Sequence, residues 1–160
     1  MEAFVKTMGK RIGPKSGTDK MFVIDGEPDA MAAEYGEYFN YFILQAYSSS
    51  GNSDLNSRFT AQATHFQQYL TPEQVANKLI VCENFENYAG KGGVNFWLDN
   101  GQAVPSLLGM AYWNPVYNGK TYRKGGVGTY HMEYEYNVSG KTGNYPFLRK
   151  AIQIMNPSIQ

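Results

Sequence analysis

Side chains able to bind a polar ligand stand at the end of the most strand-like segment of the chain, residues 39–47 (FNYFILQAY). Successive side chains of a β-strand point to opposite faces, so Gln45 and Tyr47 share one face. The other face is purely apolar, with Phe42, Leu44 and Ala46. An amide that donates and accepts, beside a phenolic hydroxyl, offers the groups needed to hold an acetamido group. The alternative is a buried Gln45 bonded to the backbone and a Tyr47 that only packs.

Polar or aromatic residues also end the other apolar runs of the sequence. They are Asp25, Glu83, Asn84 and Tyr130. Tyr130 is a candidate stacking platform, because Gly126 and Gly128 on the same strand face leave room for a ligand. In parallel α/β proteins ligands bind at the carboxyl ends of the strands, so these coincident strand ends predict one binding edge. A polar triplet such as Asp25-Gly26-Glu27 can alternatively serve only to turn the chain.

Other kinds of site are not supported by the residue types and spacings. His131 and Glu133 are two residues apart with no third metal ligand in the sequence, so a hydrogen-bonded structural histidine is favoured over metal binding. The lone Cys82 excludes an internal disulfide and a cysteine-based zinc site. Residues 90–93 (GKGG) lack the spacing of a phosphate-binding loop. We therefore predict no catalytic residue, no metal and no cofactor in this chain.

The hydrophobic pattern predicts four strand-then-helix units after an opening helix at 3–12. The strands are expected at 21–24, 39–47, 79–85 and 125–134, and the helices at 29–38 (weakly helical), 54–70, 72–78, 105–113 and 145–155. On the last strand, Tyr130, Met132 and Tyr134 would share one face, with His131, Glu133 and Glu135 on the other. Strands that alternate with helices indicate a parallel sheet.

Length limits the architecture that these units can build. A complete (β/α)₈ barrel needs about 250 residues, or roughly 40 for each strand and helix. The 160 residues therefore fit a single domain, 1–160, that is either half of such a barrel or a small open α/β sheet.

Amino-acid composition indicates which kinds of molecule the chain is suited to bind. Lys plus Arg and Asp plus Glu both number 14, so the zero net charge gives no general attraction to nucleic acid or anionic membranes. No apolar run approaches the roughly 18 residues that span a bilayer, and the first residues do not form a signal peptide, so we expect a soluble chain. Aromatic residues make up 15% of the chain, including 13 Tyr, which suits a sugar-binding surface or a Tyr-rich core.

Several segments together resemble glycoside hydrolase family 18, and within it the endo-β-N-acetylglucosaminidases of gut Bacteroidetes. They are FNYFILQAY, LIVCENFE, LLGMAYWNP, GGVGTYHMEYEY and LRKAIQIMNP, and they cover nearly the whole chain. The resemblance implies strands five to eight of a TIM-type barrel with flanking helices, opening in the helix after strand four. Members of the family are usually secreted, periplasmic or on the cell surface; for this chain the location is unknown.

The resemblance also implies a chemistry. Family members cleave between the two N-acetylglucosamines at the base of N-glycans, and the sugar's own N-acetyl oxygen acts as the nucleophile. A Glu acts as general acid and an Asp positions the acetamido group, both from an Asp-Gly-x-Asp-x-Asp-x-Glu motif that ends strand four. That motif is absent. Residues 25–29 (DGEPD) begin like it but differ in spacing and in order.

Site residues carry over one at a time. The resemblance implies that Gln45 hydrogen-bonds the reacting sugar or its acetamido group, and that Tyr47 binds the acetamido oxygen. Tyr130 matches the strand-eight aromatic under the sugar, which is usually Trp in related chitinases. Glu83, Asn84 and Asp25 lie at the same rim but match no motif residue. Without the general acid, which contributes about 10² to 10⁴ in rate, we expect no useful hydrolysis by this chain alone.

Three hypotheses follow for function. The chain is part of an N-acetylglucosamine-specific glycosidase, or a non-catalytic lectin-like module for N-acetylated sugars, or an unrelated α/β domain with incidental polar strand ends. In the first two the partner is a glycan that contains N-acetylglucosamine. A half-barrel also exposes strand edges and an apolar inner face, so we expect self-association, or association with a missing N-terminal half.

Overall fold

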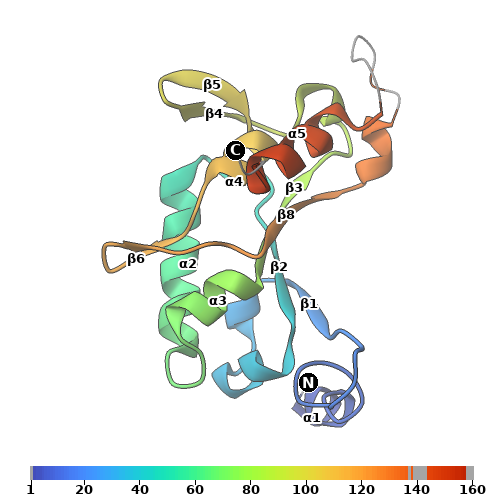
Figure 1. Ribbon diagram of the computed structural model, residues 1–160, viewed down its shortest axis with the longest axis vertical. Helices are drawn as coiled ribbons and strands as arrows, with labels where there is room; N and C mark the ends of the chain where they lie inside the picture. Colours follow the sequence, from blue (N-terminus) through green and yellow to red (C-terminus); the bar gives the residue numbers. More distant parts are fainter. Residues whose placement is uncertain (1, 137, 139–143, 158–160) are drawn as a thin grey trace. The chain divides into compact units, whose positions relative to one another are not determined.

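The fold is an α/β arrangement around a four-stranded sheet, seen in a computed structural model that describes residues 2–136, 138 and 144–157 (Figure 1). The strand order is β1-β2-β3-β8, with bounds Val23–Gly26, Tyr41–Gln45, Leu79–Asn84 and Gly126–Tyr130. β1 and β2 run parallel, with Val23 opposite Tyr41 and Gly26 opposite Leu44. The predicted α/β class with a parallel sheet is confirmed.

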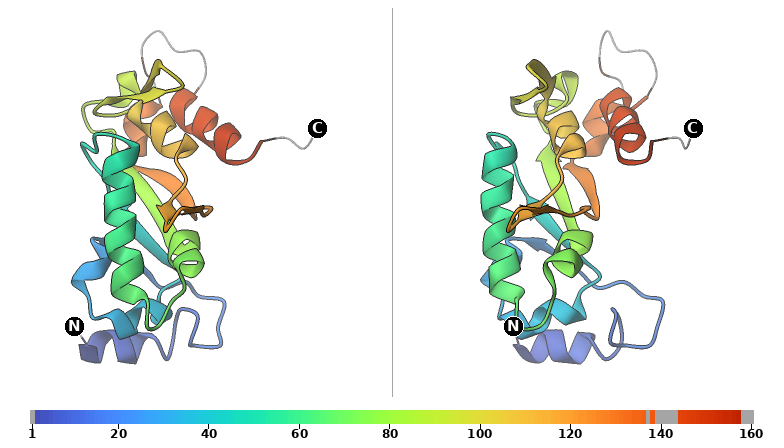
Figure 2. Two further views of the ribbon diagram at one scale, coloured as in Figure 1. Left: turned by 90° about the vertical axis from the view of Figure 1, so that its left-hand side faces the viewer. Right: turned by 60° about the vertical axis from the view of Figure 1, so that its left-hand side comes forward.

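Helices connect the strands close to where the sequence predicts them. The α-helices are α1 (Glu2–Met8), α2 (Asn52–Phe66), α3 (Pro72–Lys78), α4 (Ser106–Tyr112) and α5 (Pro146–Met155). The 3₁₀ helices are η1 (Pro28–Ala30), η2 (Ala33–Tyr38), η3 (Ala89–Lys91) and η4 (Met132–Glu135). Figure 2 gives two further views, in which α2 is seen along its length. Within the described residues, none of these helices is long and apolar enough to cross a membrane.

The chain divides into two compact units. Unit 1 comprises Met1–Leu44, Asn56–Ile80 and Asn114–Gly125, and unit 2 comprises Gln45–Leu55, Val81–Trp113 and Gly126–Gln160. The carboxyl ends of β2, β3 and β8 all belong to unit 2.

Unit 1 is built on aromatic packing between β2 and α2. Phe42 is fully buried and stacks on Phe66 with ring centroids 5.2 Å apart. The next helix, α3, begins at a capping box. The Thr71 hydroxyl oxygen accepts a hydrogen bond from the Gln74 backbone N–H, and the Gln74 side-chain oxygen accepts one from the Thr71 backbone N–H. The predicted start of this helix is therefore confirmed.

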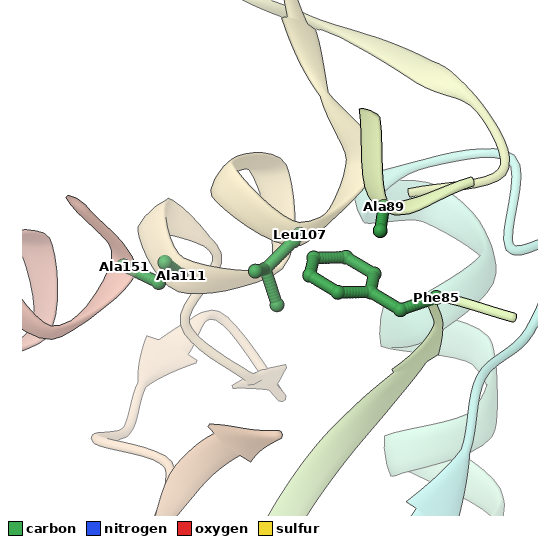
Figure 3. Packing of buried hydrophobic residues seen from close by; sticks show 5 residues of the cluster. All are labelled: Phe85, Ala89, Leu107, Ala111 and Ala151. Carbon is green, nitrogen blue, oxygen red and sulfur yellow. The ribbon is translucent and has the colours of Figure 1, made fainter. Parts of the chain in front are cut away.

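Unit 2 has its own core beyond the end of β3. Phe85, Ala89, Leu107, Ala111 and Ala151 form a buried cluster that joins η3, α4 and α5 (Figure 3). In Figure 3 the Phe85 ring and the Leu107 side chain point toward one another. This cluster fixes the loop that follows β3 onto α4.

Three of the predicted strands have wrong boundaries. β1 begins and ends two residues later than expected, so Asp25 lies inside the strand instead of after it. β2 ends at Gln45, and Tyr47 follows in a turn. The last strand stops at Tyr130, because His131 takes a left-handed conformation with φ 59° and ψ 50°. Met132, Tyr134 and Glu135 therefore belong to η4 and do not continue the alternation of β8.

Two β-hairpins were not predicted. One pairs β4 (Phe96–Asp99) with β5 (Gln102–Pro105), and the other pairs β6 (Val116–Tyr117) with β7 (Lys120–Thr121). The first lies in unit 2 and is anchored by Trp97, whose indole N–H donates to the Ser49 carbonyl at 3.0 Å.

Candidate functional site

The predicted alternation along β2 is confirmed by burial. Phe42, Leu44 and Ala46 are completely buried, whereas Gln45 is exposed and Tyr47 is partly exposed. Gln45 thus lies on the face of β2 opposite the side chains that pack in the core, and Tyr47 follows it in the turn after the strand. This is the arrangement that a ligand at the strand end requires.

Hydrogen bonds bring the ends of three strands together in unit 2. The Ala46 amide, just after β2, donates to the Cys82 carbonyl of β3 at 3.0 Å. The Phe85 amide, just after β3, donates to the Tyr130 carbonyl of β8, also at 3.0 Å. β3 thus links the end that carries Gln45 and Tyr47 to the end that carries Tyr130.

The rings of Tyr47 and Tyr130 are neighbours. Their centroids are 5.9 Å apart with an interplanar angle of 38°. Tyr130 is 47% exposed, so part of its ring is open to solvent. Two of the residues singled out from the sequence are therefore in ring contact, although they are separated by more than 80 positions in the chain.

Glu83 occupies a different environment from these residues. It is completely buried, as are Val81 and Phe85, which share its side of β3. One carboxylate oxygen, Oε1, accepts from the Asn84 amide at 2.7 Å. The other, Oε2, accepts no hydrogen bond within the described part of the chain. The carboxylate is thus away from solvent, and contact of Glu83 with a ligand stays a prediction.

Burial raises the pKa of the Glu83 carboxyl, while the Ser106 hydroxyl and the amides of Asn84 and Val94 act in the opposite direction. Gly93 (φ 131°) packs over this group: a Cβ at that position would lie 2.2 Å from Ser106 Oγ and 2.9 Å from Glu83 Oε2. Glu83 therefore underlies the loop between β3 and β4.

Asn84 and Asp25 belong to different compact units of the chain. Asn84 is partly buried in unit 2, and its Oδ1 accepts from the Glu86 amide at 2.8 Å, which shapes the turn after β3. Asp25 is exposed in unit 1, where it stands opposite Ile43 in the β1–β2 register. For both residues, contact with a ligand stays a prediction.

The sequence pattern missed the residues that extend the ring contact beyond Tyr130. The His131 ring lies 4.0 Å from the Tyr130 ring, and the Tyr134 ring lies 5.3 Å from that of His131. His131 Nδ1 is 2.6 Å from Glu133 Oε1, and this hydrogen bond lowers the pKa of Glu133. The signal in the sequence was the density of aromatic residues in TYHMEYEY. A continuous strand over 125–134 was expected there, and it would place His131 on the face opposite Tyr130 and Tyr134.

Metal binding by this segment finds no support in the geometry. Over residues 2–136, 138 and 144–157, no group of three or more His, Cys, Asp or Glu side chains is arranged to hold a metal ion. The hydrogen bond between His131 and Glu133 agrees with the interpretation of His131 as a hydrogen-bonded structural histidine.

Fold and site together define a class: a parallel α/β protein that presents amide, phenolic and aromatic groups at the carboxyl ends of its strands. A family model described as glycoside hydrolase family 18, BT1044-like, matches residues 1–154. The chain therefore belongs to glycoside hydrolase family 18, as the sequence resemblance indicated.

Individual relatives agree with this assignment. Endo-β-N-acetylglucosaminidase F2 of Elizabethkingia meningoseptica is 29% identical over an alignment of 167 positions, which covers 97% of this chain and 45% of that enzyme. A solved structure of BT1044 is 28% identical with a TM-score of 0.76, covering 98% of this chain and 44% of that one. An endo-β-N-acetylglucosaminidase from Cordyceps militaris shares the fold at 22% identity, with a TM-score of 0.63 over 96% of this chain and 49% of that one. The chain spans about half the length of the relatives it matches.

Proposed function

We propose that this chain supplies the C-terminal half of the (β/α)₈ barrel of a family 18 glycosidase that acts on N-acetylglucosamine-containing glycans. In this proposal Gln45, Tyr47 and Tyr130 hold the acetamido-bearing sugar. The observation that carries it is the contact between the Tyr47 and Tyr130 rings beside an exposed Gln45, in a chain matched by the family over residues 1–154.

Two observations support the half-barrel part of the proposal. The matched segment is 45% of endo-β-N-acetylglucosaminidase F2, and 160 residues are enough for about four strand-and-helix units of a (β/α)₈ barrel. The sheet order β1-β2-β3-β8 follows the chain order, as consecutive strands of a barrel do. On this basis residues 1–160 form one partial domain with strands five to eight.

The chemistry assigned to these side chains is positioning. In the substrate-assisted mechanism of the family, the acetamido oxygen of the sugar attacks its own anomeric carbon. A hydrogen bond from the Tyr47 hydroxyl and contacts with the Gln45 amide would hold the acetamido group in the attacking orientation. The Tyr130 ring would contact the apolar face of the sugar.

The proton donor is not among the 160 residues, because the Asp-Gly-x-Asp-x-Asp-x-Glu motif does not occur in them. General acid catalysis contributes about 10² to 10⁴ in rate. We therefore propose that the chain by itself binds the sugar without cleaving it. A lectin-like role would use the same contacts, and it remains the alternative function.

Ligand titration tests the site. Calorimetry should detect binding of di-N-acetylchitobiose, and binding of cellobiose, which lacks the acetamido groups, should be at least about tenfold weaker, since two lost hydrogen bonds of about 1 kcal/mol each exceed that factor. Tyr47→Phe should weaken di-N-acetylchitobiose binding about threefold to tenfold, because it removes one hydrogen bond. Tyr69→Phe, which changes an exposed tyrosine of unit 1, is the matched control and should leave binding unchanged.

Several outcomes count against the proposal. Equal binding of the two disaccharides, or an unchanged affinity in Tyr47→Phe, removes the acetamido assignment. Release of N-acetylglucosamine from di-N-acetylchitobiose-containing glycans by the chain alone contradicts the absence of a proton donor. If the chain binds the sugar and still shows no cleavage after an N-terminal half is added, the lectin-like alternative is favoured.

A further inference from the structure

Ring contacts at the end of β8 form a continuous series that is longer than the proposed acetamido site needs. We call the four residues Tyr47, Tyr130, His131 and Tyr134 the aromatic row. Its successive ring centroids are 5.9, 4.0 and 5.3 Å apart. All four residues belong to unit 2. The row therefore adds two further rings to the pair formed by Tyr47 and Tyr130.

Two rings of the row, those of Tyr130 and Tyr134, are open to solvent. Tyr130 is 47% and Tyr134 52% exposed, while His131 is partly buried between them. Each ring combines an apolar face with a polar atom at its edge, a hydroxyl or an imidazole nitrogen. A purely apolar partner would leave those polar atoms without hydrogen bonds, which is costly. A sugar offers C–H groups to the faces and hydroxyls to the edges.

His131 is held in a specific orientation at the centre of the row. It has a left-handed backbone (φ 59°), an uncommon conformation for a residue other than glycine. The Tyr134 amide donates to the His131 carbonyl at 3.1 Å, and Glu133 bonds the imidazole at Nδ1. Bonding at Nδ1 leaves Nε2 as the ring nitrogen that can contact a ligand. Strained backbone that neighbouring bonds maintain is common at binding sites.

We propose that the aromatic row binds two consecutive sugars, with Tyr47 and Tyr130 on the acetamido-bearing residue and with His131 and Tyr134 on its neighbour. This inference rests on the proposed function and deepens it, because it assigns a second sugar contact to His131 and Tyr134, two residues to which the family resemblance gave no role. Tyr136 is not part of the row. Its ring is 5.8 Å from that of Tyr145 instead.

The test compares ligands of different length with wild-type chain and two matched variants. Wild type should bind tri-N-acetylchitotriose more tightly than N-acetylglucosamine. Tyr134→Ala should weaken trisaccharide binding about threefold to tenfold, as the loss of an aromatic contact does, and leave the monosaccharide affinity unchanged. Tyr136→Ala removes an equally exposed tyrosine of the same segment and should change neither affinity.

A further variant, at position 131, removes the His131 ring without disturbing the turn. Glycine adopts the left-handed conformation of residue 131 without strain, so His131→Gly should keep the fold, as checked by circular dichroism, and lose trisaccharide affinity. The proposal is overturned if Tyr134→Ala and Tyr136→Ala behave alike, or if Tyr134→Ala weakens both ligands equally. If the wild-type chain binds the monosaccharide and the trisaccharide equally well, the contact of His131 and Tyr134 with a second sugar is overturned, but the acetamido site is not. Wild type that binds neither refutes the proposed function as well.

Discussion

At the scale of single residues, the alternation of apolar and polar side chains along a strand predicted the exposure of Gln45 better than the burial of Glu83. Gln45 was assignable because its strand has one purely apolar face, and burial of Phe42 and Leu44 leaves the amide on the open side. The same argument would have placed Glu83 in the interior, since its alternate neighbours Val81 and Phe85 are apolar. Its position at a strand end suggested a ligand contact instead. In the structure the Glu83 carboxylate packs under Gly93 and beside Ser106, which come from the loop after β3 and from the start of α4.

Glu83→Gln tests the buried carboxylate. Burial raises the pKa of Glu83 above its ordinary value, so the folded chain binds this proton more tightly than the unfolded chain. The contribution of Glu83 to stability is therefore full below about pH 4.5 and is lost as pH rises through the pKa of the folded state. Glutamine keeps an acceptor for the Asn84 amide and removes the buried charge.

We expect Glu83→Gln to raise the free energy of unfolding by about 1 to 3 kcal/mol at pH 7, with the gain shrinking toward pH 4. Urea denaturation across this pH range measures it. Glu86→Gln, at an exposed position three residues further on, is the control and should show no such trend. A loss of stability in Glu83→Gln at every pH would contradict the assignment.

At the scale of elements, the spacing of apolar residues along the sequence predicted the α-helices and the strands of the main sheet. It did not predict the two hairpins or the position where β8 ends. The two hairpins turn at Asn100-Gly101 and Asn118-Gly119, all with positive φ. Asn-Gly between short strands is the expected signal for such turns, yet these strands are too short to show an alternating pattern. Nothing in the sequence around His131 marks the left-handed residue that ends β8.

Gly101→Ala tests the hairpin turn between β4 and β5. Gly101 has φ 80°, and a Cβ there would meet no atom within 4 Å, so the whole cost is conformational. We expect a loss of about 1 kcal/mol in the free energy of unfolding, measured by urea denaturation. Gln102→Ala, the next and equally exposed position, should be neutral. Unchanged stability in Gly101→Ala would mean that this turn does not persist in solution.

At the scale of the whole molecule, alternation of strands and helices correctly predicted a parallel sheet, because strands covered by helices have continuous apolar segments. The division into two compact units was not predictable, since it depends on contacts between distant segments. The sheet order leaves β1 and β8 as its outer strands. Open strand edges favour pairing with another chain.

We therefore predict that the chain self-associates when it is alone. Light scattering should give a mass that increases with concentration. Val23→Lys, on β1 and 37% exposed, should reduce association because an edge lysine blocks strand pairing. Ile152→Lys, on an exposed position of α5, is the control and should have a smaller effect. A monodisperse monomer at all concentrations would count against a half-barrel with open edges.

The most direct test of the central claim is a map of NMR chemical-shift changes on addition of di-N-acetylchitobiose, with cellobiose as the matched ligand. We predict that the side-chain amide of Gln45 and the ring signals of Tyr47 and Tyr130 shift with the acetamido sugar and shift much less with the same concentration of cellobiose. Shifts confined to other residues, or identical shifts with both sugars, would contradict an acetamido-binding site at these strand ends.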